Sequence, residues 1–343
     1  MQTKRSKIYM KGAIYMVAAL FMAICGPESS AQNIAAREHQ SARRLVTRAV
    51  LRERLEFLCD SLCEGRGCGQ HGGGVAALWL QREFERMGLL KIGDSYGHAA
   101  ALGNGKHGRN VVGMLPGSKA TFRDSYVIVG AHYDHIGTLD GRMYPGADAN
   151  ASGTTALLSL IEMLSEYKDS GRTHDRNVIF IAFDGKENDM AGSKAIWKMI
   201  ENGQLIDPQS GEPITKDKVA LMVNIDQIGC TMSPLASGRK DYMIMLGNHT
   251  LKPAAQKTID FCNSTYAIDM DIDLTYYGSR NFTKMFYRLS DQRVFVDNGI
   301  PAVLFTSGIT MNTNKTRDTA ETIDLEILRK RILLMYHWLE KML

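Results

Sequence analysis

The chain has 343 residues, of which 44% are hydrophobic and 23% are charged, values typical of an ordinary globular protein. Its formal net charge is +4, but the first 31 residues hold four basic residues and one acidic residue, so without them the charge falls by three to +1. The net charge therefore does not indicate binding to nucleic acid or to an anionic membrane, and we expect no nucleic-acid partner.

Residues 1–31 are predicted to be a signal peptide. Basic residues open the chain, an apolar run covers 13–24, and Ser29-Ser30-Ala31 supplies the small residues of a cleavage site. The apolar run is too short for a stable membrane span. We expect an exported protein, periplasmic or extracellular, without a transmembrane anchor in its mature form. An uncleaved anchor and a lipid anchor on Cys25 are the alternatives.

Helix and strand patterns then alternate along the chain. Apolar residues recur at helical spacing over 41–62, 73–87, 152–164, where Ser152 is a candidate N-cap, 192–200 and 323–343. Short apolar runs predict strands at 110–115, 126–131, 177–183, 221–228, 242–246 and 301–306. This order predicts an α/β fold with a mostly parallel sheet covered on both faces. No linker divides residues 32–343, so we expect one domain.

Five cysteines follow the predicted signal peptide. Cys59, Cys63 and Cys68 are close together, but their spacing lacks the paired C-x₂-C of a structural zinc site. One disulfide and buried free thiols both remain open, and no function is assigned to these residues.

Polar residues stand where the predicted strands end. His132-Tyr133-Asp134 follows one strand, Asp184 and Glu187 follow the next, and Asp226 lies within the predicted strand 221–228. Ligands of such sheets gather beyond the carboxyl ends of the strands. An unpaired buried carboxylate costs about 3–5 kcal/mol, so a cation near Asp226 would offset that cost. Histidine with several carboxylates suits zinc or a similar divalent ion.

Five segments together resemble a known family. They read GAHYDHIG (130–137), YPGADANASG (144–153), FIAFDGKENDMAGS (180–193), VNIDQIG (223–229) and SDQ followed by NGIPAVLF (290–305). In this order they are similar to the secreted di-zinc aminopeptidases, a family that also includes glutaminyl cyclases and the transferrin receptor ectodomain. The resemblance covers about residues 110–324. It implies a three-layer α/β/α sandwich of the zinc-exopeptidase type, around a mostly parallel mixed sheet.

The resemblance also implies roles for individual residues. His132, Asp148 and Asp226 match the ligands of the first metal, Asp148 being the residue that bridges both metals. Glu187 matches a ligand of the second metal, and Asp134 matches the residue that orients His132. One zinc ion is therefore expected, and the second site is doubtful.

The chain departs from the family pattern at the second metal and at the general base. Lys186 stands at the general-base position, and Asn314, after Thr313, stands at the position of the last histidine ligand. Gln292 replaces a further histidine. A protonated lysine cannot accept the proton of a metal-bound water, and loss of a general base costs about 10²–10⁴ in rate. We expect the ammonium group of Lys186 to lie near Glu187 and Asp148 and to substitute for the second cation; a solvated lysine is the alternative.

Three functions follow from this pattern. The first is a zinc metallo-exopeptidase that removes N-terminal residues from peptides with impaired activity. The second is a catalytically inactive protein that binds peptides in the same cleft. The third is a single-zinc acyltransferase similar to glutaminyl cyclases. In the first two, the expected partner is a peptide.

Overall fold

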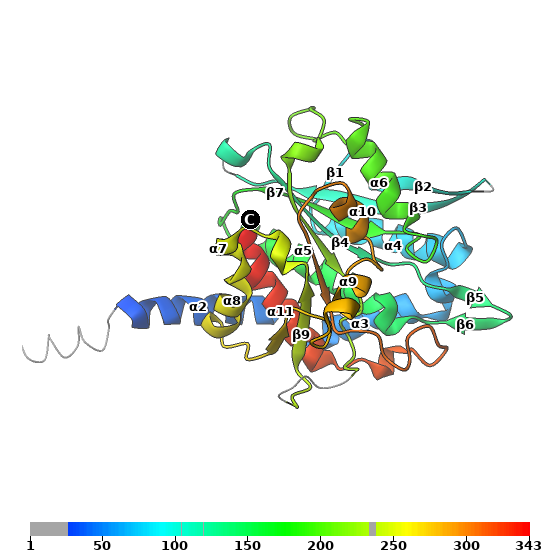
Figure 1. Ribbon diagram of the computed structural model, residues 1–343. Helices are drawn as coiled ribbons and strands as arrows, with labels where there is room; N and C mark the ends of the chain where they lie inside the picture. The colour runs from blue at the N-terminus through cyan, green and yellow to red at the C-terminus, as the bar shows by residue number, and fades with distance from the viewer. Residues whose placement is uncertain (1–26, 104, 119, 233–237) are drawn as a thin grey trace, which may run out of the picture.

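The computed structural model describes residues 27–103, 105–118, 120–232 and 238–343 (Figure 1). Most of the predicted signal peptide, including Cys25, lies outside these residues. Helix α2 (Pro27–Leu45) begins before the predicted cleavage site after residue 31 and continues past it. Among the described helices, none combines the length and apolar character needed to cross a membrane.

A nine-stranded sheet forms the centre of the molecule, in the order β1-β3-β7-β4-β8-β11-β9-β10, with β2 also paired to β3. The middle strands β7, β4, β8 and β11 are parallel, whereas β1, β2 and β3 on one side and β9 on the other join antiparallel. The nine strands are Leu90–Lys91, Gly97–Gly103, Lys106–Leu115 (β1–β3), Tyr126–His132 (β4), Asn177–Phe183 (β7), Val219–Ile225 (β8), Tyr242–Leu246 (β9), Asp271–Asp273 (β10) and Ala302–Thr306 (β11).

The two faces of this sheet pack against different helices. Val127 and Val129 of β4 belong to the larger core, whereas Ile128 belongs to the smaller one, because successive strand residues point to opposite faces. The larger core contains α3 (Arg48–Cys59), α4 (His71–Arg86), α5 (Ser152–Asp169), α8 (Thr258–Thr265) and α11 (Leu325–Met342). The smaller core contains α6 (Ala191–Glu201) and α10 (Gln292–Asp297). The expected three-layer α/β/α architecture is confirmed.

Short elements complete the fold. Helices α7 (Pro253–Gln256) and α9 (Arg280–Phe286) flank β10 in sequence, and β5 (Gly137–Leu139) pairs with β6 (Arg142–Tyr144) in a hairpin that projects from the body in Figure 1. Strands β4 and β7 are buried along their whole length, as their continuous apolar sequences predict.

The structure differs from the predicted pattern at several boundaries. The single helix expected over 41–62 is two helices, because the Thr47 hydroxyl caps a new helix by accepting a hydrogen bond from the Val50 amide at 3.2 Å. Ser152 is the first residue of α5 rather than its N-cap, and its hydroxyl donates to the Asp148 carbonyl. Strand β8 ends at Ile225, so Asp226 follows the strand instead of lying within it. All five described cysteines are free thiols.

Candidate functional site

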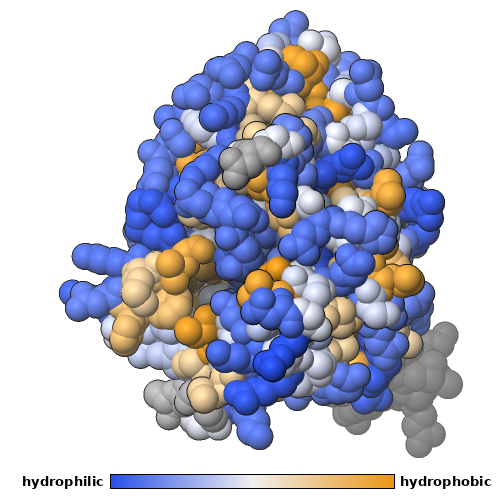
Figure 2. Space-filling view, turned by 90° about the vertical axis from the view of Figure 1, so that its right-hand side faces the viewer, coloured by the Kyte–Doolittle hydropathy of each residue, from blue (hydrophilic) through white to orange (hydrophobic). Residues whose placement is uncertain are grey.

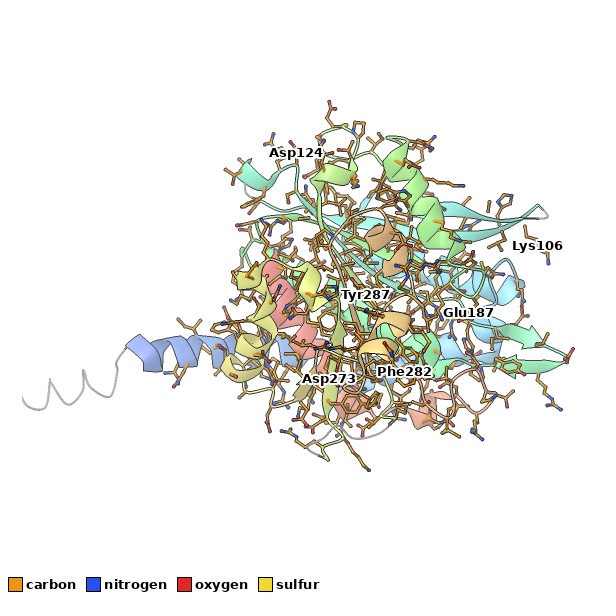
Figure 3. The ribbon with its side chains drawn as sticks, viewed as in Figure 1. Lys106, Asp124, Glu187, Asp273, Phe282 and Tyr287 are labelled. Carbon is orange, nitrogen blue, oxygen red and sulfur yellow. The ribbon has the colours of Figure 1, made fainter. Side chains whose placement is uncertain are left out.

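Three parallel strands bring the candidate site residues to one edge of the sheet. His132 is the last residue of β4, the turn holding Lys186 and Glu187 follows β7, and Asp226 follows β8. Parallel strands end at the same edge, so residues separated by up to 94 positions meet there. Figure 3 labels Glu187 at this edge.

His132 lies between two carboxylates and is fully buried. Its Nε2 atom is 3.2 Å from Oδ1 of Asp226, and its Nδ1 atom is 3.1 Å from the carbonyl oxygen of Asp134. Burial lowers the pKa of His132, but Asp226 and Asp134 raise it more, to about 10. The imidazole is therefore held in its charged form, with Asp226 as its direct partner.

Lys186 adds a second positive charge to this edge. Its ammonium nitrogen is 2.9 Å from Oε1 of Glu187, and only 17% of its side chain is exposed. Burial opposes the charge, but Asp226 and Glu187 together raise the pKa of Lys186 above its ordinary value. The Asp134 carboxylate accepts the backbone amides of Lys186 and Glu187, both at 3.1 Å, which fixes this turn beside His132. Lys186 is thus a largely buried cation among carboxylates. The alternative prediction, a lysine solvated at the surface, does not agree with this burial.

A cavity of about 250 Å³ opens beside these charges. Lys186 and Asp226 line one part of it, and apolar and aromatic residues line much of the remainder, namely Tyr276, Phe286, Leu289, Leu304 and Ile309. Leu289 and Ile309 are also more than 40% exposed, as is Phe282 of α9. Figure 2 shows hydrophobic residues gathered around a hollow on this face, and Figure 3 labels Phe282. The arrangement is a small apolar pocket with ion pairs at its inner end.

Asp148 does not face this cavity. Its Oδ1 atom accepts the backbone amides of Gly229 at 2.8 Å and Cys230 at 3.2 Å, and the side chain is fully buried. The next residue, Ala149, lines the cavity instead. The geometry does not support the bridging role expected for Asp148. Its carboxylate joins the loop after β8 to the start of α5, and burial together with Asp318 raises its pKa to about 6.

The remaining substituted positions have different surroundings. Asn314 lines the cavity, and its neighbour Thr313 donates its hydroxyl to the side-chain oxygen of Gln227 at 3.0 Å. Gln292 is buried away from it, accepting from Asn224 at 2.7 Å and donating to the Tyr287 carbonyl at 2.6 Å. Only Asn314 of this pair is therefore available to a ligand in the cavity.

The expected metal-ligand set is not assembled. Within the residues that the structure describes, no three His, Cys, Asp or Glu side chains gather in a group that could hold a metal ion. His132 and Asp226 bond directly to each other, Glu187 pairs with Lys186, and Asp148 is directed to backbone amides. The residues present do not fit a two-metal centre.

The sequence did not indicate that Ala149 and a wall of apolar residues line the cavity. Tyr276, Phe286 and Leu289 come from a segment without a recognised motif, and their approach to Asp226 depends on how α9 packs. Ala149 lies inside a quoted motif, and only the hydrogen bonds that direct Asp148 elsewhere reveal that Ala149 is the residue that lines the cavity.

The mixed sheet, its two helical layers and the pocket beyond the strand ends define an α/β/α protein of the zinc-exopeptidase fold. The family model of peptidase family M28 matches residues 110–339. The chain therefore belongs to peptidase family M28, a metallopeptidase family.

Individual relatives are distant and longer. The chain is 28% identical over 167 residues to leucine aminopeptidase 1 of Sclerotinia sclerotiorum, covering 48% of this chain and 39% of that protein. It spans less than two thirds of the length of the curated relatives it matches.

Among solved structures, the LapA aminopeptidase of Legionella pneumophila superposes with a TM-score of 0.65 at 18% identity, over 88% of this chain and 73% of the other. The glutaminyl cyclase of Porphyromonas gingivalis gives 0.59 at 15% identity, over 87% and 99%. At these identities the structures support the fold alone.

Proposed function

We propose that this chain is a peptide-binding member of family M28 that holds one terminal residue of a peptide in the cavity and does not hydrolyse it. The observation that carries the proposal is the ion network at the inner end of the cavity. Asp226 pairs with His132, and Lys186 occupies the same site paired with Glu187. These pairs satisfy the carboxylates without a metal ion.

Zinc is the metal that the family and its zinc aminopeptidase neighbours imply. Zinc prefers neutral imidazole and free carboxylates in a tetrahedral arrangement at about 2.0–2.2 Å. Here a cationic lysine pairs with Glu187 and interacts electrostatically with Asp226, the two carboxylates that would serve as ligands. The side chain of Ala149 offers no oxygen from the neighbouring loop. Binding of zinc would require displacing Lys186 and breaking the His132–Asp226 bond.

The cavity itself supports recognition of an apolar residue. Aromatic and aliphatic side chains form much of its wall, and burial of one leucine-sized side chain stabilises a complex by about 1.5–3 kcal/mol. Glu187 and Asp226 offer acceptors to a peptide amino group, and the ammonium of Lys186 offers a donor to a peptide carbonyl. We further propose that residues 32–343 form one exported domain, which presents this cavity to extracellular or periplasmic peptides.

Metal content and turnover test the proposal together. The purified chain is compared with the variant Ala149→Asp/Lys186→Glu/Asn314→His, which restores carboxylates and an imidazole around the cavity. We expect the wild type to bind less than one zinc per chain and to leave aminoacyl p-nitroanilides intact with added zinc, cobalt or manganese. The variant should gain zinc. Chelator-sensitive hydrolysis by the wild type would show a metallo-exopeptidase and overturn the proposal.

Peptide binding is measured separately by calorimetry. Peptides with leucine or phenylalanine at the first position should bind, and peptides with aspartate there should bind at least tenfold more weakly. Ala149→Phe, which fills the cavity at its wall, should abolish binding. Cyclisation of N-terminal glutamine by the wild type would instead identify the acyltransferase reaction.

A further inference from the structure

A second cavity lies far from the strand ends, in a groove between α2 and the end of α8. Its volume is about 840 Å³. Figure 1 shows α8 beside α2 on the side of the molecule away from the β5–β6 hairpin. The groove is lined by Gln32, Ala36, His39, Gln40, Arg43, Arg44, Ser264, Thr265, Tyr266, Ala267 and Arg329.

The lining is basic and contains no acidic residue. Arg43, Arg44 and Arg329 contribute three guanidinium groups from two helices, and the other polar lining residues are neutral donors or acceptors. In the described part of the chain, neither Arg43 nor Arg44 has a hydrogen-bonding or ionic partner. Arg329 contacts Glu326 only at 3.3 Å, and its Nε atom is buried without an acceptor. The groove therefore holds donors and positive charge that the protein does not satisfy.

The walls of the groove are fixed by contacts behind it. His39 Nδ1 lies 3.1 Å from Nε2 of the fully buried His337, and Glu38 pairs with Arg172 at 3.2 Å. The ring of Tyr266 stacks on His337 with centroids 3.5 Å apart. The Glu38 carboxylate also accepts a hydrogen bond from the hydroxyl of Tyr266 at 3.4 Å, so it is already paired with Arg172 behind the groove and with one lining residue. These contacts hold α2 against the body.

The electrostatic effect of the arginines is visible at His39. Burial lowers the pKa of His39, and repulsion from His337, Arg43 and Arg329 lowers it as well, so that together they bring it to about 4. Neutralising the arginines with an anion would remove part of this repulsion and raise the pKa of His39. The pKa of His39 therefore measures the charge in the groove.

We propose that this groove binds a phosphate group, carried by a soluble phosphomonoester or by the headgroup of an anionic phospholipid. Arginine forks match phosphate oxygens with paired, charge-assisted hydrogen bonds, which lysines and amides do not reproduce. The volume exceeds what phosphate alone needs and leaves room for the group that carries it. The site is independent of the peptide cavity, which lies at the carboxyl ends of the strands.

The test compares two double variants that remove the same number of charges. Arg43→Gln/Arg44→Gln empties the groove of two arginines. Arg48→Gln/Arg52→Gln removes two exposed arginines of α3, which line a different hollow together with Glu56, Glu321 and Glu326. Glycerol 1-phosphate binding is measured by calorimetry and by the titration of His39 in NMR spectra. Lipid binding is measured by cosedimentation with vesicles of phosphatidylglycerol and phosphatidylcholine, and with phosphatidylcholine alone.

Wild type should bind one of the two probes. Binding of glycerol 1-phosphate with a raised pKa of His39 identifies a soluble ligand, and binding of the anionic vesicles alone identifies a lipid headgroup. The groove variant should lose at least tenfold in affinity for glycerol 1-phosphate. For lipid it should lose about twenty-five-fold, since each of the two arginines contributes about fivefold. The α3 variant should stay within twofold. Wild type that binds neither probe, or equal losses in both variants at unchanged melting temperature, overturns the proposal.

Discussion

Among the residues of the cavity, Lys186 carries most of the argument for the proposed function. An ammonium group and a metal ion both neutralise carboxylates, but only the metal ion activates water. The lysine pairs with Glu187 at 2.9 Å and helps to lower the pKa of the buried Asp226, and it leaves no proton acceptor at its own position. In the proposed function, Lys186 therefore stabilises the site electrostatically and takes no part in hydrolysis.

Replacement of Lys186 by methionine should lower the free energy of unfolding by about 2–4 kcal/mol, because the buried Asp226 and the partly exposed Glu187 lose a cationic neighbour. The matched control is Lys194→Met, whose partner Asp189 lies at 2.6 Å but is 77% exposed, and which should cost at most about 1 kcal/mol. Urea denaturation measures both. Equal losses in the two variants would show that the Lys186 pair is no stronger than a surface pair.

His174 predicts an acid-dependent loss of stability. Burial lowers its pKa from 6.5 to about 4, so the unfolded chain takes up a proton before the folded chain does. Stability from this residue is therefore complete above pH 6.5 and falls as the pH drops towards 4. Between pH 7 and pH 5 the wild type should lose about 2 kcal/mol more than His174→Gln. Parallel urea curves for the two proteins across this range would contradict the prediction.

At the scale of elements, Asn150 connects the three segments that build the site. Its amide nitrogen donates to the carbonyls of His132 at 3.2 Å and Ile225 at 2.9 Å, the ends of β4 and β8. Its oxygen accepts the amides of Gly153 at 3.0 Å and Gln227 at 2.9 Å. One fully buried side chain thus sets the spacing of two strand ends and the first turn of α5.

Asn150→Ala should cost about 3–5 kcal/mol, because it leaves several buried backbone groups without partners. Asn298→Ala removes one partly buried bond, from its amide to the Val294 carbonyl at 2.7 Å, and should cost about 1 kcal/mol. Thermal and urea denaturation compare the two variants. A cost for Asn150→Ala no greater than for Asn298→Ala would show that the three segments are positioned by other contacts.

The elements themselves were largely predictable. Strand β9 has the bounds that its apolar run predicts, and the bounds of α4 and α6 lie within two residues of the predicted ones. These elements are predictable because a buried strand or helix face requires apolar residues at a regular local spacing. Near the N-terminus the prediction differs from the structure, because the hydroxyl of Thr47 caps a new helix within what the sequence pattern indicates as one continuous helix. The sequence likewise did not predict the end of β8 at Ile225, because apolar residues continue on both sides of Asp226.

At the scale of the whole molecule, buried arginines join elements that are distant in sequence. Arg331 of α11 is fully buried and donates to the carbonyls of Tyr242 at 2.8 Å, Ile228 at 2.7 Å and Cys230 at 2.8 Å. It links the last helix to β9 and to the loop after β8, whose backbone amides donate to the carboxylate of Asp148. Neither the periodicity of α11 nor any motif indicates this role.

Arg331→Lys keeps the charge but cannot reproduce the planar fork, so it should lower the free energy of unfolding by about 2–4 kcal/mol. Arg293→Lys, in an exposed pair with Asp297 at 3.4 Å, should change it by less than about 0.5 kcal/mol. Denaturation curves under the same conditions give both values. If lysine restores wild-type stability at position 331, the charge matters there and the fork does not.

The sequence by itself determined the layered α/β architecture and the edge of the sheet at which the site lies, because buried strands and the polar residues that follow them are local signals. It also placed His132 and Asp226 at that edge and predicted the pairing of Lys186 with Glu187, whereas the predicted approach of Lys186 to Asp148 is not found. Only the tertiary structure decided that Ala149, and not Asp148, faces the cavity. Adjacent residues of an irregular loop have no fixed period, so their directions depend on partners such as Gly229 and Asp318, which the chain brings into contact only when it folds.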